Sequence, residues 1–224
     1  MRRVLALCVA SCLAVSVAAC QAAPGEGQQP PAPPPSAVAG PEIPPPAVPA
    51  PAAPLLSAAE QAQIDQELVT AAKANNELLV AELIGRGGDV NAKDAIQDSA
   101  FLYAGAEGFN GVLRLTLAAG ADVASTNRYG GTALIPASEH GHVETVRILI
   151  DAGVPVNHVN NLGWTAMQEA IVLNNGGLRQ QEVVRLLLEA GADPNIPDRD
   201  GRTALENAER LGFAEIAALI RPRS

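Results

Sequence analysis

The chain has 224 residues and a formal net charge of −9, and Lys and Arg form no run after Arg2 and Arg3. Binding to a nucleic-acid backbone needs clustered cations that release counterions, so we expect no nucleic-acid partner. Residues 57–224 are rich in Ala, Leu, Val and Gly and are numerous enough to bury one sizeable apolar core.

Residues 1–19 have the pattern of a secretory signal peptide. Arg2 and Arg3 supply a positive start, residues 4–17 form an apolar run, and small residues follow it. The apolar run is too short to span about 30 Å of hydrocarbon as a permanent helix. We therefore expect export and removal of this segment.

The segment Val17-Ala18-Ala19-Cys20 resembles the lipobox of bacterial lipoproteins. In that family the signal is cut before the cysteine, which then carries acyl chains, and two or three chains hold a protein stably at a membrane. The resemblance implies a lipid-anchored protein of the cell envelope, with Cys20 as its lipidation site. Gln21 resembles an outer-membrane signal, which implies an anchor facing the periplasm in a host with two membranes. Cleavage after Ala19 without lipidation is the alternative.

Residues 20–56 are predicted to form a disordered tether. Thirteen of the 18 prolines lie between Pro24 and Pro54, among Ala, Gly and Gln, so the segment cannot bury enough apolar surface to fold. Its proline runs favour polyproline II, and such a tether would reach up to roughly 100 Å. We expect a spacer between membrane and domain; a ligand for a proline-reading module is the alternative.

Two sequence markers recur with one period in residues 57–224. A glycine followed by a short turn recurs, with spacings of 33, 33 and 38 residues, at Gly87, Gly120, Gly153 and Gly191. A Ser or Thr recurs with the same spacings at Ser99, Thr132, Thr165 and Thr203. A fixed period of about 20–50 residues predicts stacked supersecondary units.

The third unit shows the internal pattern best and predicts two short helices. Thr132 is predicted to cap a first helix over residues 133–140, which Gly141 ends in a left-handed conformation. A second helix is predicted over residues 143–151, ending before Gly153. Helices this short do not persist alone, so neighbouring units must bury each other's apolar faces.

Residues 130–153, which begin Gly-Gly-Thr-Ala-Leu-Ile and end Leu-Ile-Asp-Ala-Gly, resemble an ankyrin repeat along their whole length. The resemblance covers roughly residues 64–221. It implies an all-α ankyrin-repeat solenoid of about five helix-turn-helix units joined by hairpin-like loops, at 64–94, 95–127, 128–160, 161–198 and 199–221. The family's Thr-Pro-Leu-His motif is altered in these units, and the missing histidine implies loss of a hydrogen bond between neighbouring loops.

Three local features qualify this pattern. Ser57-Ala58-Ala59-Glu60 predicts a capping box that opens an N-terminal helix, and residues 214–220 are the last predicted helix. The five extra residues of the fourth unit fall within 174–180 and predict a longer interhelical loop, which either contacts a partner or is neutral. The aspartates that follow the repeated glycines are expected to bind their own turns; these are Asp89, Asp122 and Asp193.

The sequence contains no recognisable catalytic motif, so we expect a non-enzyme without a cofactor or small-molecule substrate. His140 and His142 form a His-x-His pair that could bind a metal weakly, but two ligands do not complete a coordination shell. His142 also stands where ankyrin repeats often have a histidine that begins a helix. We therefore expect no metal site.

The resemblance to ankyrin repeats implies a protein-binding surface on the loop tips and the inner face of the first helices. The carried-over positions are Arg128, Tyr129, Glu139, His140, Leu162, Trp164, Arg199 and Arg202, with Ala95, Ile96, Asp98, Ala106, Glu107, Asn161, Leu173 and Arg210 at matching places. Trp, Tyr and Arg are enriched at binding hot spots, so Tyr129 and Trp164 are the leading predicted contacts. The alternative is that each ring folds back onto a neighbouring loop.

The predicted function is that of a membrane-anchored ankyrin-repeat scaffold that mediates protein-protein interaction in the bacterial cell envelope. A non-catalytic regulatory or protective subunit of an exported enzyme is the alternative. It would bind one enzyme stoichiometrically, whereas a scaffold would capture several proteins. The fold alone does not name the partner.

Overall fold

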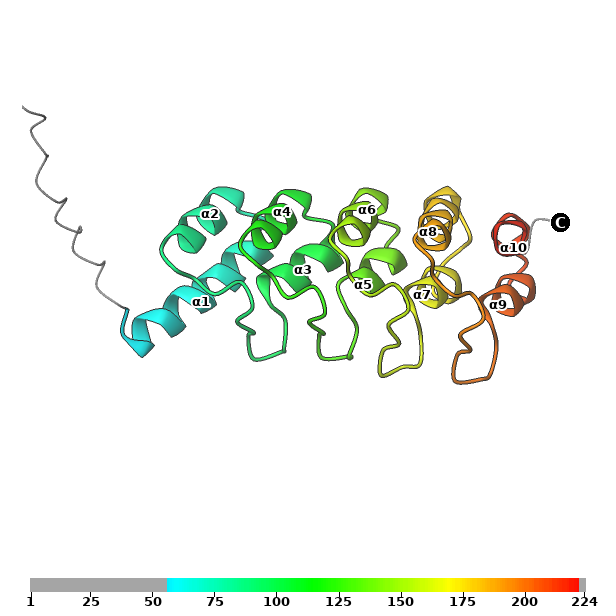
Figure 1. The fold of residues 1–224 in the computed structure, drawn as a ribbon, viewed down its shortest axis with the longest axis horizontal. Coiled ribbons are helices and arrows are strands. Elements are labelled where there is room, and N and C mark those ends of the chain that lie inside the picture. The colour runs from blue at the N-terminus through cyan, green and yellow to red at the C-terminus, as the bar shows by residue number, and fades with distance from the viewer. Residues whose placement is uncertain (1–55, 222–224) are drawn as a thin grey trace, which may run out of the picture. The chain divides into compact units, whose positions relative to one another are not determined.

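The computed structural model describes residues 56–221, which contain ten α-helices and no strand. The helices form five antiparallel pairs arranged in two rows (Figure 1). The first-helix row contains α1 (Ala58–Lys73), α3 (Ala100–Glu107), α5 (Leu134–Glu139), α7 (Ala166–Val172) and α9 (Ala204–Arg210). The second-helix row contains α2 (Glu77–Gly85), α4 (Asn110–Ala118), α6 (Val143–Asp151), α8 (Leu178–Glu189) and α10 (Ala214–Ile220). The predictions for the signal peptide, Cys20 and the tether up to residue 55 lie outside the described residues.

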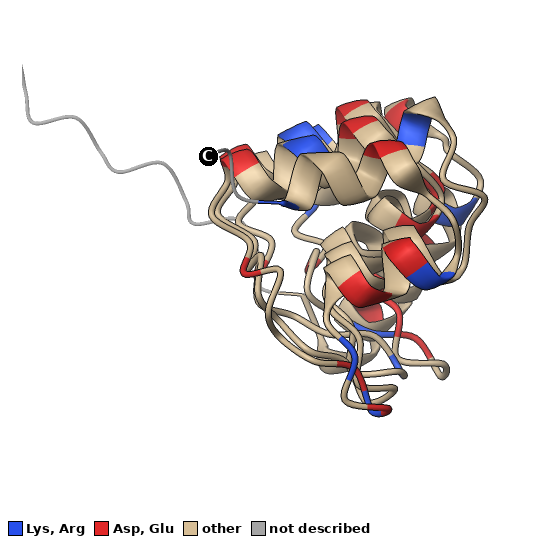
Figure 2. Ribbon diagram, turned by 90° about the vertical axis from the view of Figure 1, so that its right-hand side faces the viewer, with Lys and Arg blue, Asp and Glu red and all other residues tan. Residues whose placement is uncertain are grey.

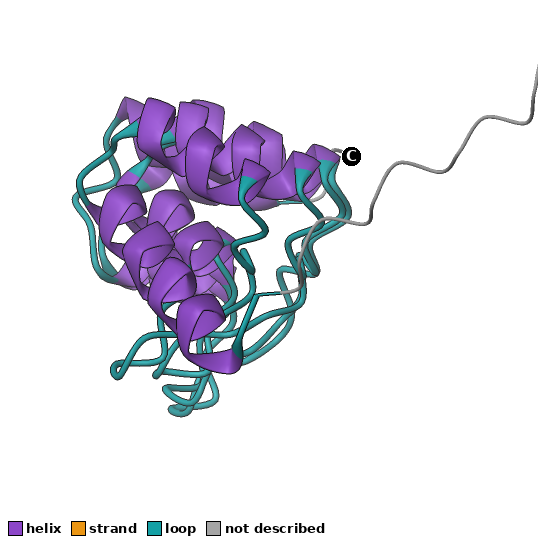
Figure 3. Ribbon diagram, turned by 90° about the vertical axis from the view of Figure 1, so that its left-hand side faces the viewer, coloured by secondary structure: helices purple, strands orange, loops and turns teal. Residues whose placement is uncertain are grey.

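The loops between successive pairs project together on one side of the helices (Figure 3). Each loop descends from the second-helix row, turns back as a hairpin and enters the next first helix (Figure 1). This arrangement confirms the predicted all-α solenoid with hairpin-like loops.

Several predicted helix boundaries are confirmed. The helices α6 and α10 have the predicted bounds, and Ser57 and Glu60 form the predicted capping box. Gly141 and Gly153 adopt positive φ angles of 67° and 84°, as expected for glycines that end a helix.

The predicted cap at Thr132 is wrong. The helix α5 spans 134–139 rather than the predicted 133–140, and Thr132 Oγ1 is buried without a hydrogen-bond partner among the described residues. In the units that begin with Ser99, Thr165 and Thr203, the backbone N–H four residues later donates to the carbonyl of that Ser or Thr. Pro136 stands at this place and has no N–H, so the turn tightens and Ile135 N–H donates to Thr132 O at 3.1 Å.

The insertion in the fourth unit is only partly a loop, which corrects the prediction. The helix α8 begins at Leu178, so residues 178–180 form its first turn, and it has 12 residues where α4 and α6 have 9. These residues include no Gly or Pro, so they extend the helix instead of the loop. Asn174 fastens the remaining loop: its Nδ2 donates to Glu139 O at 2.8 Å, and its Oδ1 accepts from Gln180 Nε2 at 3.0 Å.

The apolar core lies between the two rows of helices. The first helices α3, α5, α7 and α9 each contain a fully buried alanine at a matching place, and these are Ala104, Ala137, Ala170 and Ala208. Their small side chains let the second helices approach, and large apolar side chains fill the space around them, among them Phe101, Leu113, Leu134, Leu149, Ile171 and Leu187. Neighbouring first helices also pack tightly, because a Cβ on Gly105 of α3 would lie 2.7 Å from the Cβ of Ala133, the residue before α5.

Side-chain amides tie the loop after one helix pair to the loop after the next. In each case the amide Nδ2 donates to a glycine carbonyl, and Oδ1 accepts from an aspartate N–H. Asn91 makes these bonds to Gly120 (3.2 Å) and Asp122 (2.7 Å), and Asn157 makes them to Gly191 (3.4 Å) and Asp193 (2.8 Å). We call these contacts the loop ladder. As predicted, Asp89, Asp122 and Asp193 also bind their own turns, each accepting from the N–H two residues later at 2.9 Å.

The loop ladder is interrupted in the middle of the stack. Ala124 occupies the place of Asn91 and Asn157 in its own unit and has no amide side chain. Pro155 occupies the place of the aspartate that would donate, and it has no N–H. Both halves of the link are therefore missing between these two loops.

Candidate functional site

Each hairpin tip contains one Asp or Asn whose side chain accepts hydrogen bonds from backbone N–H groups of the same tip. These residues are Asp94, Asn127, Asn160 and Asp198, and in each the Oδ1 atom accepts from the N–H groups two and four residues later. At the third tip, Asn160 Oδ1 accepts from Leu162 and Trp164 N–H, both at 3.0 Å. This bonding fixes the backbone from which both side chains project.

Neighbouring hairpin tips are joined by residues that were predicted to face a partner. Arg128 reaches back to Asp98 at 3.0 Å, and the Arg199 guanidinium donates to the carbonyl of Asn161. Asn161 N–H in turn donates to Tyr129 O at 2.9 Å. Arg128 and Arg199 therefore stabilise the row of tips, whatever else they contact.

Three consecutive first helices supply matching positions to one hollow. The fourth residue after the unit's Ser or Thr is Tyr103 in α3, Pro136 in α5 and Glu169 in α7, and all three line it. One turn further along, Glu107 of α3 and His140, the residue that follows α5, also line the hollow. Because the repeat stacks equivalent positions in register, residues about 33 apart in sequence lie side by side.

The hollow is a cavity of about 380 Å³ between these helices and the second and third hairpin tips, and we call it the concave pocket. It brings together five of the eight residues predicted for protein binding, namely Arg128, Tyr129, Glu139, His140 and Leu162. Asp98, Ala106, Asn160 and Leu173 also line it. Its volume lies at the lower end of the range of about 300–1,000 Å³ that is usual for ligand pockets.

The other three predicted residues lie in a smaller neighbouring cavity of about 180 Å³. Trp164, Arg199 and Arg202 line it together with Asp198, Asp200, Val172 and Arg210. Leu162 belongs to both cavities, so the predicted residues form one continuous face rather than separate sites.

The two predicted aromatic contacts differ in exposure. Tyr129 is 51% exposed, and the Arg128 guanidinium carbon lies 4.7 Å from the centre of its ring. Trp164 is half-buried against the hairpin that contains Arg199 and Arg202. Leu162 is 44% exposed. Tyr129 and Leu162 therefore offer the open apolar surface of this face, whereas part of the Trp164 ring is packed.

Glu169 is the site residue that sequence reasoning missed. Its side chain is only 5% exposed, although it lines the concave pocket, and Oε1 accepts from Asn160 Nδ2 at 2.7 Å. Burial, with repulsion from Glu139, raises the pKa of Glu169 to about 7, against the smaller opposing effects of Asn160 and His140. The sequence could have indicated Glu169 through its position as the fourth residue after Thr165, because residues at this position of the first helices face the hollow.

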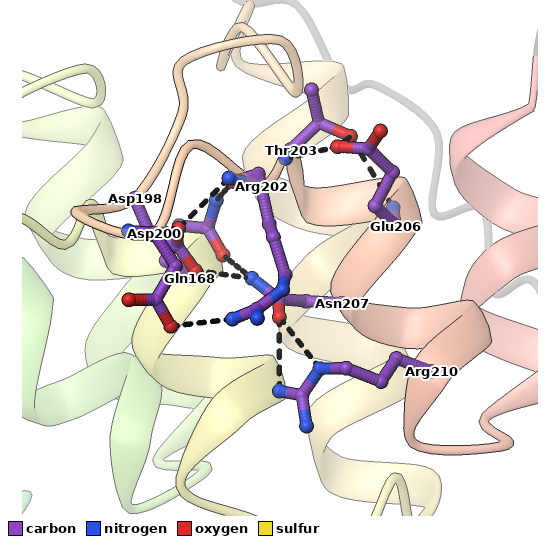
Figure 4. A network of polar contacts seen from close by, with 8 residues as sticks. All are labelled: Gln168, Asp198, Asp200, Arg202, Thr203, Glu206, Asn207 and Arg210. Carbon is purple, nitrogen blue, oxygen red and sulfur yellow. Dashed lines mark hydrogen bonds and ion pairs between the residues drawn. The ribbon is translucent and has the colours of Figure 1, made fainter.

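A buried polar network joins the fourth and fifth units beside this face (Figure 4). Gln168 Nε2 donates to Ile196 O at 3.3 Å and to Arg202 O at 3.1 Å, and Asn207 Nδ2 donates to Gln168 Oε1 at 3.0 Å. The expected loss of a bond between neighbouring loops is therefore wrong for this unit, because Gln168 at the place of the family's histidine supplies it.

Asp198 anchors the same network from the fourth hairpin tip (Figure 4). Burial alone would raise the pKa of Asp198, but hydrogen bonds from Asn207 Nδ2 (2.7 Å) and from its own hairpin outweigh burial and hold the pKa below its usual value. Asp198 is therefore ionised at neutral pH and holds Asn207 in place.

The two histidines of the His-x-His pair do not converge on a common point. The His140 ring hydrogen-bonds the carbonyl of Ala106 through Nδ1 at 2.9 Å, and the two ring centres lie 5.4 Å apart. Burial, followed by the neighbouring His140, lowers the pKa of His142. Within residues 56–221, no three His, Cys, Asp or Glu side chains are grouped in a way that could hold a metal ion.

Charges are mixed along the domain. Acidic and basic positions both occur on the helix rows and on the loop tips in the view of Figure 2. No helix within residues 56–221 is both long enough and apolar enough to span a membrane.

Comparison with known proteins assigns this architecture. The family model described as ankyrin repeats (3 copies) matches residues 68–157 and 101–198. The chain resembles the crystal structure of an ankyrin repeat domain from Acinetobacter baumannii AYE, with 62% identity and a TM-score of 0.67 over 68% of this chain and 78% of that one. It also resembles the crystal structure of the ankyrin repeat protein EF0377, with 41% identity, a TM-score of 0.66 and the same coverage of 68% and 78%.

A curated relative shares a shorter stretch. The ankyrin repeat protein YahD of Escherichia coli (strain K12) is 43% identical over 52 residues, which are 23% of this chain. The aligned stretch spans about a quarter (26%) of YahD. Together these matches show that the chain belongs to the ankyrin-repeat family, whose domains generally bind protein partners and are generally not catalysts.

Proposed function

We propose that the protein is a membrane-anchored scaffold of the bacterial cell envelope that binds a protein partner through the face formed by the concave pocket and its smaller neighbour. The observation that carries the binding surface is the convergence of all eight predicted residues on two cavities that share Leu162. The lipobox at Cys20 and the proline-rich segment after it support the anchor and the spacer.

The composition of this face suits a protein partner. Tyr129, Leu162 and Leu173 are 51%, 44% and 45% exposed, so the pocket is rimmed by open apolar surface. Charged side chains surround this surface, as at the polar rim of a typical interface. The hairpin tips are fixed by internal hydrogen bonds, so little ordering is needed on binding.

The test is affinity capture from envelope extract with the full exported chain and a Tyr129→Ala, Leu162→Asp double variant. These side chains are chosen because neither of them joins one hairpin tip to another, whereas those of Arg128 and Arg199 do. Leu78→Asp is the matched control, since Leu78 is 86% exposed in α2 of the second-helix row and lines neither cavity. A partner retained by wild type and control and lost by the double variant is expected.

Retention of the same partner by the double variant would place the binding surface elsewhere on the stack. Absence of any specific partner from the wild-type capture would reject the scaffold itself. A single partner recovered in a one-to-one ratio would instead favour the alternative function, a regulatory or protective subunit.

The anchor is tested separately. Membrane fractionation of cells that express the full chain is expected to find it in the membrane fraction, and Cys20→Ser is expected to move it to the soluble fraction. Mass spectrometry of the N-terminal peptide should show the acyl chains on Cys20. An unmodified N-terminus that begins at residue 20 would contradict lipidation and leave ordinary signal cleavage.

A further inference from the structure

The concave pocket contains a buried carboxylate that is incompletely satisfied. Glu169 is 5% exposed, and its Oε1 is held by Asn160 Nδ2 at 2.7 Å. Its other oxygen accepts no hydrogen bond from residues 56–221, and it forms no ion pair within that range. A buried carboxylate without a cation is energetically costly, so this group is poised to accept one.

The residues that line the pocket carry an excess of negative charge. Four carboxylates line it, from Asp98, Glu107, Glu139 and Glu169, against the single guanidinium of Arg128. That guanidinium is already paired with Asp98 at 3.0 Å, so it does not neutralise Glu169. The potential inside the pocket therefore favours a cation and disfavours an acidic or phosphorylated group.

The walls of the pocket suit an amphipathic side chain. Tyr129, Leu162 and Leu173 provide partly exposed apolar surface at its opening. Lys and Arg bury their methylene stems along such surface while the charged end reaches a polar partner.

We infer that the concave pocket receives a Lys or Arg side chain of the protein partner, with its cation paired to Glu169 and Glu139 and its stem against Leu162 and Tyr129. The inference rests on the proposed function, since it names the chemistry that the scaffold recognises. Glu169 acts here as a specificity-determining residue at the end of the pocket, and Glu139 adds charge nearer the surface.

The test uses a random dodecapeptide library selected on the immobilised full exported chain at pH 8. Wild type is expected to enrich peptides with one Lys or Arg at a shared position. Glu169→Gln, which keeps an oxygen for Asn160, is expected to lose this enrichment, and Glu139→Gln to weaken it. Glu215→Gln, an exposed glutamate of α10, is the matched control and should select the same peptides as wild type.

The pH dependence of binding supplies a second readout. A cation binds the ionised form of Glu169, whose pKa lies at about 7, so affinity for a selected peptide should fall about tenfold from pH 8 to pH 6. The titratable and charged groups facing Glu169 are Glu139 of α5 and the following His140, with Asp98, Glu107, Arg128 and the tyrosines at the rim. Glu215→Gln is again the control and should keep the dependence.

The outcomes separate this inference from the proposed function. Peptides without a shared basic residue, an unchanged basic enrichment with Glu169→Gln, or no enriched peptide at all would overturn the inference. In that case, if the Tyr129→Ala, Leu162→Asp variant still fails to bind the enriched peptides or the captured partner, this face is the binding surface but the pocket does not recognise a cation. Circular dichroism and thermal unfolding of each variant confirm that its fold is retained.

Discussion

Gln97 holds a left-handed backbone conformation, with φ at 66°, at a place where the other hairpin tips have Gly130, Gly163 and Gly201. A side chain with a Cβ is disfavoured there by about 1–2 kcal/mol, because the Cβ crowds the following carbonyl. The first hairpin tip therefore carries a strain that the other three tips avoid.

We expect Gln97→Gly to raise the free energy of unfolding by about 0.5–1 kcal/mol, since the relief of strain exceeds the greater freedom of glycine in the unfolded chain. Urea denaturation at an unchanged m-value measures this gain. Ala95→Gly in the same hairpin, where φ is not positive, is the control and should not stabilise. A loss of stability with Gln97→Gly would show that its side chain makes a contact that outweighs the strain.

A second effect at single-residue scale concerns the pH dependence of stability through Glu169. Its pKa is raised from 4.5 to about 7 in the folded protein, so the folded state keeps a proton that the unfolded state releases. This contribution is fully present below about pH 4.5 and is lost as pH rises to about 7.

Relative to Glu169→Gln, the wild type is therefore expected to lose on the order of 2 kcal/mol of stability between pH 5 and pH 8. Chemical denaturation of both proteins at the two pH values gives the difference directly. Glu215→Gln should show no such difference from wild type. If the stability of the wild type relative to Glu169→Gln instead increases as pH rises, Glu169 is not a buried carboxylate without a compensating charge.

At the scale of elements, the loop ladder makes the coupling between units measurable. Asn157 joins its loop to the next through Gly191 O and Asp193 N–H, whereas Asn195, at the same place in the last loop, binds only Asp193 of its own turn. The two residues occupy matching places in their loops and differ in whether a further unit follows.

Asn157→Ala is expected to lower the free energy of unfolding by about 1–2 kcal/mol, because it leaves the Asp193 N–H without its partner. Asn195→Ala is expected to cost clearly less. Thermal unfolding of the two variants side by side checks the comparison. Equal losses would mean that the amide acts within its own turn and not between units.

The elements also show what the sequence could and could not predict. The bounds of α6 and α10 were predictable because a glycine-containing turn precedes each helix and local apolar spacing continues through it. The cap at Thr132 failed because Pro136 removes one N–H, an effect of a single residue that overrides the repeat pattern. Glu169 was missed because the groups that set its pKa, Asn160 in the preceding hairpin and Glu139 in α5, are brought next to it only by the fold.

The whole domain is a linear stack in which each helix pair contacts only its neighbours. Within residues 56–221, interior pairs are covered on two sides, whereas the last pair, α9 and α10, is covered on one. Local stability should therefore decline from the middle of the stack towards its C-terminal end.

Hydrogen exchange followed by mass spectrometry is expected to show the slowest exchange in α5, α6 and α7 and the fastest in α10. Truncation after residue 198, which removes the last unit, should accelerate exchange in α7 and α8 and leave α3 unaffected. Uniform exchange along the chain, or a uniform response to truncation, would show that the five units unfold as one cooperative block.

Where the loop ladder is missing at Ala124 and Pro155, the two neighbouring loops are joined nearer their tips instead. His158 Nε2 hydrogen-bonds Gly130 O at 2.6 Å, and Asn161 N–H donates to Tyr129 O at 2.9 Å. Both contacts lie beside the concave pocket, whose lining includes Tyr129 and Leu162. Occupancy of the pocket and the mechanical coupling between these two units would therefore influence each other.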